Sequence, residues 1–250
     1  MKVSFVIPFH NEEKNSRLML TKLVSFCKKQ AYRSEIVPVD DRSSDNTGKI
    51  LKEFSRKYAF INPLWRRDDG EEKGNTMGRA LVEASKKASG EIIIWTMGDL
   101  SDYMDSYNEI IAKLKKGYDL VFGSRYMPGG SRGNLDPLKA FLSSWGTLLA
   151  RLLFAVPVHD ITNAFRGFKR ELIEKIQLDS AGFSISPEFA IKAHLAGYQL
   201  GEVPTVYTNR KEGVSSFKLY HMTKSYLEVY SELFFRFKIL HQPLDFIKNK

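Results

Sequence analysis

Short apolar runs alternate with amphipathic segments along the first half of the chain. The runs have the length and flanking residues of buried strands and lie at residues 3–7, 36–39, 61–65, 92–97 and 119–123. The segments between them carry apolar residues at helical spacing, as in Ile50, Leu51 and Phe54. Strands that alternate with helices connect by right-handed crossovers into a mainly parallel sheet. The pattern therefore predicts a doubly wound α/β fold with helices on both faces.

The second half of the chain has longer helical patterns and fewer strands. Residues 126–136 are rich in Gly, Pro and Asn, which is typical of a loop. Apolar residues at helical spacing follow from Leu138, residues 200–207 resemble a strand, and residues 220–240 predict a long aromatic helix. We expect this last helix to be amphipathic and to precede a polar end.

Polar clusters follow three of the predicted strands. They occupy residues 40–45, 98–102 and 123–125. In open α/β sheets ligands bind beyond the carboxyl ends of the strands, so these clusters mark a candidate binding site. Asp40 and Asp41 can accept hydrogen bonds from ribose hydroxyls or from a base N–H. Asp45 is better explained as a cap of the second helix, and Asn11 is expected to cap the first.

The acidic residues after the fourth predicted strand suit a divalent cation. Mg²⁺ and Mn²⁺ prefer hard oxygen ligands and keep several positions open, so one or two carboxylates are enough. Asp99 and Asp102 meet that need, although Asp102 can instead cap the following helix. Farther upstream, Arg66, Arg67 and Lys73 precede a helix start, where backbone N–H groups and a lysine suit a phosphate.

Composition narrows the choice of partners. Among 250 residues there are 38 Lys and Arg and 29 Asp and Glu, which gives a formal net charge of +9. A basic protein favours anionic partners, but the cations are scattered and form no arm of the kind that binds nucleic acid, so we expect no nucleic-acid partner. The single cysteine, Cys27, excludes an intramolecular disulfide and indicates a reducing, cytoplasmic compartment.

The chain is expected to be soluble or to bind a membrane peripherally. The N-terminal residues are better explained as a strand than as a signal peptide, and no run approaches the roughly 20 apolar residues of a spanning helix. In the last predicted helix, apolar residues recur beside Lys224, Arg236 and Lys238. The apolar set is Tyr226, Tyr230, Leu233, Phe234 and Phe237. Such a helix either lies on an anionic membrane surface or packs on the domain or on a second subunit, so a homo-oligomer is possible.

Several common catalytic motifs are missing or out of context. Residues 129–133 match G-x-S-x-G, but the prolines on either side make this segment an extended loop and not the strand-to-helix turn of a serine hydrolase. No glycine-rich dinucleotide motif follows a strand, and the sequence has no P-loop. The five histidines have no metal-ligand spacing.

Seven strings of the chain occur in an order that resembles the second family of inverting glycosyltransferases. They are VIPFHNEE, VPVDDRSSDNT, KGNTMGRAL, MGDLSD, VFGSRYMPGG, HDITNAFRGFKRELI and EVPTVYTNRKEGVSSF. The resemblance covers about residues 1–220 and is greatest to the dolichyl-phosphate mannose synthase-like branch, whose members pass a sugar to a polyprenyl phosphate. It implies a GT-A-type catalytic domain at 1–218, with a nucleotide-sugar half at about 1–125 and an acceptor half at about 126–218. Residues 219–250 would form a C-terminal amphipathic helical tail.

The resemblance also implies roles for residues at matching positions. Those that match the nucleotide contacts are Pro8, His10, Glu12, Val39 and Asp41, and the chemistry of Asp40 and Lys73 adds them to the nucleotide-sugar site. The metal site for Mg²⁺ or Mn²⁺ is matched by Asp99 and Ser101, with Asp102 close by. The acceptor phosphate would be held by Arg125, Lys139, Ser143 and Arg210.

Three departures from the family pattern bear on the metal and on the acceptor. Met97-Gly98-Asp99 stands where the family has D-x-D, so the first acid is missing, and Asp102 can compensate. Lys139 stands where the family has an arginine, which leaves a cation without the bidentate fork. Residues 213–216 are Gly-Val-Ser-Ser in place of Gly-Glu-Ser-Lys.

Three functional hypotheses follow. The first is transfer of a sugar from a nucleotide diphosphate to a polyprenyl phosphate at the cytoplasmic face of a membrane. The second is transfer to a glycan hydroxyl, which needs a carboxylate base, and Glu188 and Asp102 are the candidates. The third is a nucleotide-sugar-binding protein without catalytic activity.

Overall fold

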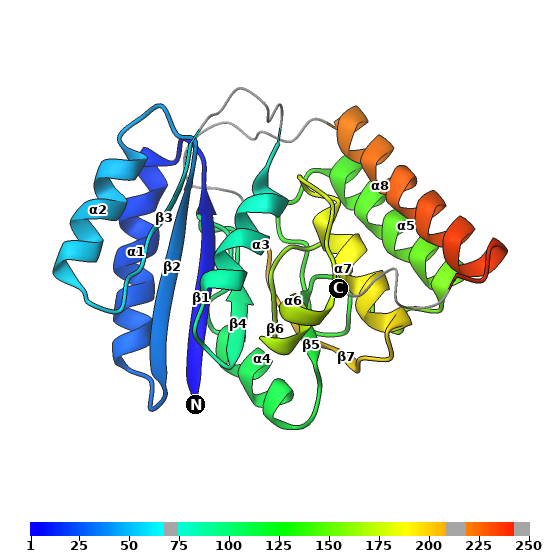
Figure 1. Cartoon of the computed structure of the whole chain (residues 1–250), viewed down its shortest axis with the longest axis horizontal. Helices are drawn as coiled ribbons and strands as arrows, with labels where there is room; N and C mark the ends of the chain where they lie inside the picture. Colours follow the sequence, from blue (N-terminus) through cyan, green and yellow to red (C-terminus); the bar gives the residue numbers. More distant parts are fainter. Residues whose placement is uncertain (68–74, 209–218, 243–250) are drawn as a thin grey trace.

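A seven-stranded sheet forms the centre of the protein, whose computed structural model describes residues 1–67, 75–208 and 219–242 (Figure 1). The strands are β1 (Lys2–Phe9), β2 (Arg33–Asp41), β3 (Leu64–Arg66), β4 (Ile92–Trp95), β5 (Leu120–Ser124), β6 (Arg166–Lys169) and β7 (Leu200–Pro204). Their order in the sheet is β3-β2-β1-β4-β6-β5-β7. Only β6 is antiparallel to its neighbours, β4 and β5. The prediction of a mainly parallel α/β sheet is confirmed.

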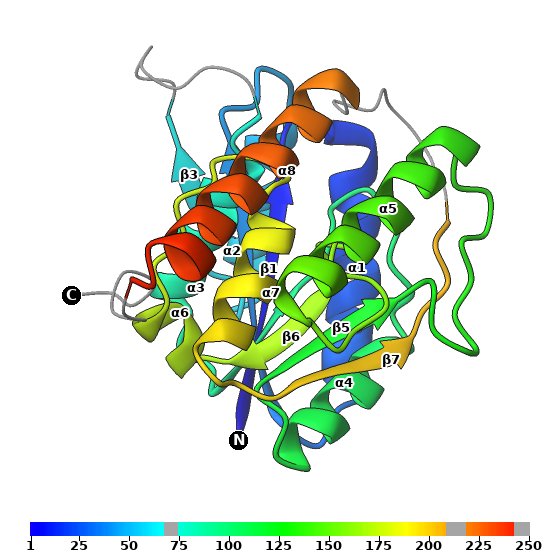
Figure 2. The same cartoon turned by 90° about the vertical axis from the view of Figure 1, so that its right-hand side faces the viewer.

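Helices cover both faces of the sheet, as predicted. One face carries α1 (Glu13–Lys28), α2 (Thr47–Lys57) and α4 (Ser106–Lys115). The other carries α3 (Met77–Lys87), α5 (Pro137–Phe154), α6 (Glu171–Lys175), α7 (Ile185–Leu195) and α8 (Leu219–Phe234), which continues into a π-helical turn at Phe235–Ile239. In β4 the alternation divides the two cores, since Ile92 and Ile94 face the first and Ile93 and Trp95 the second. Figure 2 shows α5 and α8 side by side over α7.

The antiparallel strand β6 and helices α6 and α7 were not among the predicted elements. β6 has the sequence Arg-Gly-Phe-Lys, which lacks an apolar run. Its first residue, Arg166, is nevertheless fully buried, because its guanidinium donates to the backbone carbonyls of Ile161, Asn163, Ala164 and Ser186. The same group lies 4.8 Å from the centre of the Phe122 ring. A polar residue in a strand was compatible with the core only because the fold supplies these acceptors.

The start of α1 is capped from the neighbouring β2–α2 loop and not by Asn11, as the sequence suggested. Asp45 accepts the N–H of Glu13 at 3.0 Å, and the Thr47 hydroxyl accepts that of Glu12 at 3.0 Å. Asn11 has a φ of 53° and accepts the Ser44 N–H instead. The other carboxylate oxygen of Asp45 accepts the N–H of Thr47, the first residue of α2, but Asn46 and not Asp45 occupies the N-cap position of that helix.

The aromatic stripe of the last helix mostly packs on the domain. Tyr226, Tyr230 and Leu233 are at most 7% exposed, and the Tyr230 hydroxyl donates to the Gly146 carbonyl of α5 at 2.9 Å. The sequence left open whether this stripe contacts a membrane, the domain or a second subunit. These three residues pack on the domain. Within the described part of the chain, no helix combines the length and the apolar character that a bilayer crossing requires.

Candidate active site

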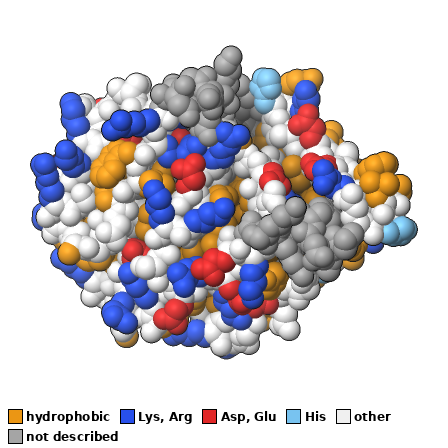
Figure 3. All heavy atoms as spheres, viewed as in Figure 1, with side chains coloured by type: hydrophobic (Ala, Val, Ile, Leu, Met, Phe, Trp, Pro, Cys, Tyr) orange, Lys and Arg blue, Asp and Glu red, His pale blue; other side chains and the backbone are white. Residues whose placement is uncertain are grey.

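A cleft of about 1270 Å³ lies at the carboxyl ends of the central strands and extends between α5, α7 and α8. Ten of the residues predicted from the sequence line it: Pro8, His10, Glu12, Asp41, Asp99, Ser101, Asp102, Arg125, Lys139 and Ser143. They come from segments that are far apart in the sequence, and the topology of the sheet brings them to one edge. On the outer surface, basic and acidic side chains are interspersed, without a single basic patch on the face seen in Figure 3.

Four predicted residues do not belong to this described lining. Val39 is fully buried in the core, where it packs under α3. Asp40, the penultimate residue of β2, accepts the N–H of Ser43 at 3.1 Å from the loop that follows. Lys73 and Arg210 lie outside the described residues.

Asp41 is the centre of a hydrogen-bond network at the end of β2. Its carboxylate accepts from Arg66 Nη1 at 2.6 Å and from the Thr76 hydroxyl at 2.7 Å. Its carbonyl lies 2.6 Å from Nδ1 of His10 at the end of β1. Arg66 and Thr76 thus donate to the carboxylate of Asp41, a residue that is only 4% exposed. The end of β2 is therefore fixed against both β1 and the start of α3.

The acid pair after β4 lies in a tight loop. Gly98 permits this path, because a Cβ there would come within 2.5 Å of the Phe9 ring. Asp99 accepts the N–H of Ser101, while one oxygen of Asp102 accepts the Met97 N–H at 2.7 Å and the Thr96 hydroxyl at 3.0 Å. Burial, with a further contribution from the negative charge of Asp99, raises the pKa of Asp102 to about 7.

Asp102 does not cap the following helix, which was the alternative drawn from the sequence. Helix α4 begins at Ser106 with Asp105 at its N-cap position. The carboxylate of Asp102 instead points back to the end of β4 and lines the cleft together with Asp99. Asp99 and Asp102 thus share one wall of the cleft.

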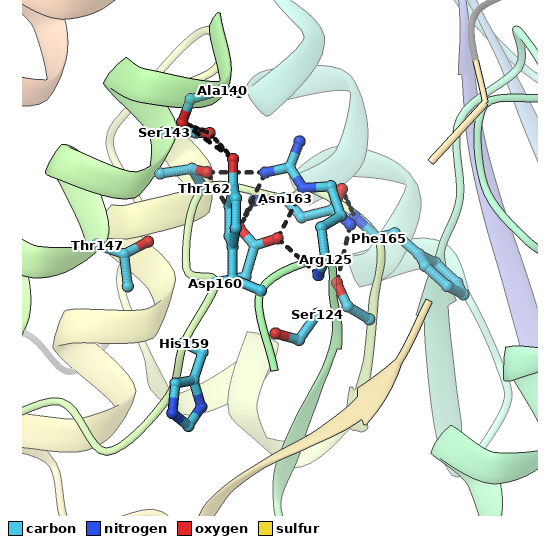
Figure 4. Close-up of polar contacts among 12 residues, drawn as sticks. Ser124, Arg125, Ala140, Ser143, Thr147, His159, Asp160, Thr162, Asn163 and Phe165 are labelled. Atoms are coloured by element: carbon cyan, nitrogen blue, oxygen red, sulfur yellow. Dashed lines mark hydrogen bonds and ion pairs between the residues drawn. The ribbon is translucent and has the colours of Figure 1, made fainter. Parts of the chain in front are cut away.

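Arg125, directly after β5, forms a buried bidentate ion pair with Asp160 (Figure 4). Nε and Nη2 of the guanidinium lie 2.7 and 2.9 Å from the two carboxylate oxygens, and Nη2 also donates to Thr162. Burial opposes the charged form of Arg125, but Asp160 outweighs it and raises the pKa of the guanidinium. Among the described residues these bonds use Nε and Nη2, so Nη1 keeps its donors for a ligand in the cleft.

The start of α5 contributes the other two described residues of the predicted acceptor site. Asp136 caps the helix by accepting the N–H of Lys139, whose side chain lines the cleft. The Ser143 hydroxyl donates to the Ala140 carbonyl at 3.0 Å and is also hydrogen-bonded to the Tyr126 hydroxyl. Tyr126, the residue that follows Arg125, is thus hydrogen-bonded to Ala140 and Ser143 of α5.

Glu188, one of the two carboxylates considered as a base, is committed to structural bonds. Its oxygens accept the N–H groups of Asp179 and Ser180 and the ammonium of Lys192, at 2.6 to 2.9 Å. The side chain is 3% exposed. Of the two candidates, only Asp102 keeps a carboxylate oxygen outside the hydrogen bonds of the described residues.

Residues 4–177 match the family described as Glycosyl transferase family 2. The chain belongs to this family. A dolichol-phosphate mannosyltransferase of Pyrococcus furiosus is 32% identical over 222 residues, which are 87% of this chain and 60% of that protein. A polyprenol monophosphomannose synthase of Mycolicibacterium smegmatis is 29% identical over 84% of this chain and 78% of its own length. The chain thus spans about three fifths of the archaeal glycosyltransferase.

Solved structures of a synthase with a similar fold confirm the GT-A-like architecture. Glucosyl-3-phosphoglycerate synthase of Mycobacterium tuberculosis aligns with a TM-score of 0.67 over 97% of this chain and 79% of that one, at 18% identity. Its crystals are described as complexes with Mn²⁺, UDP and phosphoglyceric acid, and in another case with Mg²⁺ and UDP. At 18% identity the similarity concerns the fold alone.

Sequence reasoning gave no role to Asp160, although the residue lies in one of the strings that carry the family resemblance. A buried arginine needs either a counter-ion or several hydrogen-bond acceptors, and the chain offers many acids as candidate counter-ions. Only the antiparallel return of the chain into β6 brings Asp160 beside the end of β5. From the sequence one could have predicted that a buried Arg125 needs such a partner, but not that this partner is Asp160.

We predict that Asp160→Asn lowers the free energy of unfolding by about 3–5 kcal/mol, because it leaves the buried charge of Arg125 without a counter-ion. The matched control is Glu53→Gln, which breaks the equally bidentate pair of Glu53 with Arg17 on the surface and should change stability little. Urea unfolding of the three proteins measures both effects. Equal losses in the two variants would contradict a special role for the buried pair.

Proposed function

We propose that the protein transfers a sugar from a nucleoside diphosphate sugar to the phosphate of a polyprenyl phosphate, with inversion at the anomeric carbon. The observation that supports this most is the composition of one cleft. The acid pair of Asp99 and Asp102 lines this cleft together with the cations Arg125 and Lys139. Lys139 lies in the first turn of α5, whose outer side is apolar. The names of the two curated relatives, a dolichol-phosphate mannosyltransferase and a polyprenol monophosphomannose synthase, favour the same acceptor class.

A phosphate acceptor fits a cleft without a dedicated base. A phosphate monoester is anionic at neutral pH, so one of its oxygens can attack the anomeric carbon directly. The new carbon–oxygen bond forms as the bond to the diphosphate breaks, and the nucleoside diphosphate leaves with the bonding electrons. Arg125 and Lys139 would reduce the repulsion between the two anions and orient the attacking oxygen.

The residues of the acid pair fit a divalent metal. Asp99 and Asp102 line the same cleft, and the charge of Asp99 raises the pKa of Asp102, a repulsion that a cation would relieve. Within the described residues no three His, Cys, Asp or Glu side chains form a metal site alone. Mg²⁺ and Mn²⁺, however, commonly complete their coordination with substrate phosphates and water. We propose that Asp99 and Asp102, with Ser101 beside them, hold such an ion, which would neutralise charge on the leaving diphosphate when bound.

A glycan hydroxyl is the second candidate acceptor, and one observation favours it. One oxygen of Asp102 lines the cleft outside the bonds to Met97 and Thr96, so this carboxylate could accept the proton of a hydroxyl. Such an acceptor would not need the cations Arg125 and Lys139. The two candidates therefore differ in which side chains an acceptor requires.

We propose that the outer face of α5 meets the membrane, at the cytoplasmic side. Its exposed apolar residues are Leu138, Phe141, Trp145, Leu148 and Leu152, with 43 to 72% of their surface accessible. The spacing of three and four residues aligns them along one side of the helix. An amphipathic helix of this kind lies in the membrane interface with its apolar side in the lipid. The lipid tail of an acceptor would then start beside Lys139 and Ser143 on the inner side of the same helix.

For the acceptor, we predict transfer of radiolabelled sugar to short polyprenyl phosphates and not to the matching polyprenols or to free oligosaccharides. Lys139→Ala should raise the KM for the phosphate about tenfold, since one contact to a charged group is lost, and leave the donor KM unchanged. Lys115→Ala, an exposed cation of α4, is the control. Use of alcohols or oligosaccharides as well as phosphates would replace this acceptor by the glycan hydroxyl. Tight nucleotide binding without turnover would support the non-catalytic hypothesis.

For the metal, we predict that Mn²⁺ enhances the thermal stabilisation of the protein by UDP or GDP, because a ligand that binds the folded state raises Tm by mass action. Asp99→Asn should remove the increment that depends on Mn²⁺. Asp105→Asn, which changes a nearby acid outside the cleft lining, should keep it. An increment of the same size in all three proteins would exclude Asp99 as a ligand.

For the membrane, we predict that Trp145→Ser reduces flotation of the protein with anionic liposomes about tenfold, because a large apolar side chain contributes roughly 1.5–3 kcal/mol when buried. The matched control is Trp65→Ser. Trp65 is 47% exposed, against 53% for Trp145, but it lies in β3 at the far end of the molecule from α5 (Figure 1). Unchanged flotation of Trp145→Ser, or an equal loss in Trp65→Ser, would count against α5 as the contact.

A further inference from the structure

Tyr226 of α8 is a buried polar side chain whose hydroxyl has no hydrogen-bond partner among the described residues. The residue is 7% exposed and lines the cleft. Its ring lies 6.4 Å from that of Tyr230 and packs near Gly146 of α5, where a Cβ would come 3.6 Å from the ring. Tyr230, one turn farther along, donates its hydroxyl to the Gly146 carbonyl. Of these two neighbouring phenols, one is used to hold the helix and the other faces the cleft.

The surroundings of Tyr226 are cationic. Arg125 lines the same cleft as Tyr226. Burial raises the pKa of the Tyr226 phenol, the charges of Arg125 and Arg166 act in the opposite direction, and the charge of Asp160 adds to the effect of burial. Arg125 is paired with Asp160, whereas the hydrogen bonds of Arg166 all go to backbone carbonyls. The two guanidinium groups and the single carboxylate of Asp160 together carry one net positive charge, which makes this end of the cleft suited to an anion.

A phenol of this kind is a hydrogen-bond donor throughout the neutral pH range, because burial keeps it protonated. The hydroxyl is not among the buried unsatisfied atoms of the described residues but opens to the cleft, so an oxygen of a bound ligand can accept its proton in place of solvent. Arg125 Nη1 offers further donors in the same cleft. A phosphate oxygen between the two would receive hydrogen bonds from both a cation and a neutral hydroxyl.

We propose that the Tyr226 hydroxyl is a ligand of the acceptor phosphate, donating to an oxygen of the group that Arg125 holds. The proposal rests on the proposed function and adds a binding residue to it. It also gives α8 a direct part in the acceptor site. The helix is fixed on α5 through Tyr230 and Gly146, so it presents Tyr226 from the side of the cleft opposite the sheet.

The test compares two single-oxygen deletions on the same helix. Tyr226→Phe keeps the ring and its packing, so its Tm should stay near that of the wild type. Its KM for a short polyprenyl phosphate should rise about tenfold, the size expected for one lost hydrogen bond to a charged group, with the donor KM unchanged. Tyr220→Phe removes the hydroxyl of a phenol that is 76% exposed on the same helix and lies outside the cleft lining, so it should leave both Tm and the acceptor KM unchanged.

A binding measurement separates this proposal from the proposed function. The stabilisation of each protein by inorganic phosphate and by farnesyl phosphate is followed as a change in Tm. Weaker stabilisation of Tyr226→Phe by both ligands supports a contact to the phosphate, and weaker stabilisation by farnesyl phosphate alone assigns Tyr226 to the lipid and overturns the proposal. If the wild type uses the phosphate acceptor and Tyr226→Phe equals it in KM and binding, only this inference fails. If the wild type transfers sugar to alcohols instead, the proposed function fails, and this inference fails with it.

Discussion

The buried ion pair of Arg125 and Asp160 is the interaction on which the second half of the cleft depends. The Arg125 guanidinium is largely removed from water, since the residue is only 9% exposed, and the fully buried Asp160 compensates its charge with both carboxylate oxygens. The pair joins the end of β5 to the segment that leads into β6. Because β6 runs against its neighbours, this segment returns to the same edge of the sheet at which β1, β2 and β4 end.

A second carboxylate holds the first in position. Glu202 of β7 accepts the backbone N–H groups of His159 and Asp160 at 2.7 and 3.1 Å, and its other oxygen lies 2.7 Å from the His159 ring. Glu202 of the neighbouring strand β7 therefore holds Asp160 in position, and Asp160 in turn fixes the orientation of Arg125. A cation held this rigidly loses little conformational freedom when an anion binds, which is the advantage of a preorganised site.

The sequence predicted the first half of the fold well because strands there are apolar runs and helices are amphipathic. Ile92 to Trp95 and the face of Ile50, Leu51 and Phe54 are buried as their pattern indicates. β6 was missed because Arg166 and Lys169 stand at its ends, and the burial of Arg166 depends on carbonyls that only the folded chain assembles. Local spacing carries no information on such distant acceptors.

The candidate site follows the same division. The polar residues at strand ends were identified, since the position of a ligand in a parallel sheet follows from topology. Their partners were not, because the register of β2 with β3 brings Arg66 to Asp41, and the turn after β4 brings Asp102 to Met97. Asn11 illustrates the limit: its residue type suits a cap, yet Asp45 from another loop takes that role.

The two sides of α5 connect the chemistry of the cleft to the surface of the protein. Ser143 on the inner side is 8% exposed and bonded to Tyr126, while Trp145, two residues later, is 53% exposed. A helix turns by about 100° per residue, so residues two positions apart lie on nearly opposite sides, and one helix can separate a polar inner side from an apolar outer side. An acceptor with a charged head and an apolar tail has the same polarity along its length. Because α8 packs on α5 through Tyr230 and Gly146, Tyr226 and the apolar outer side of α5 belong to one pair of contacting helices.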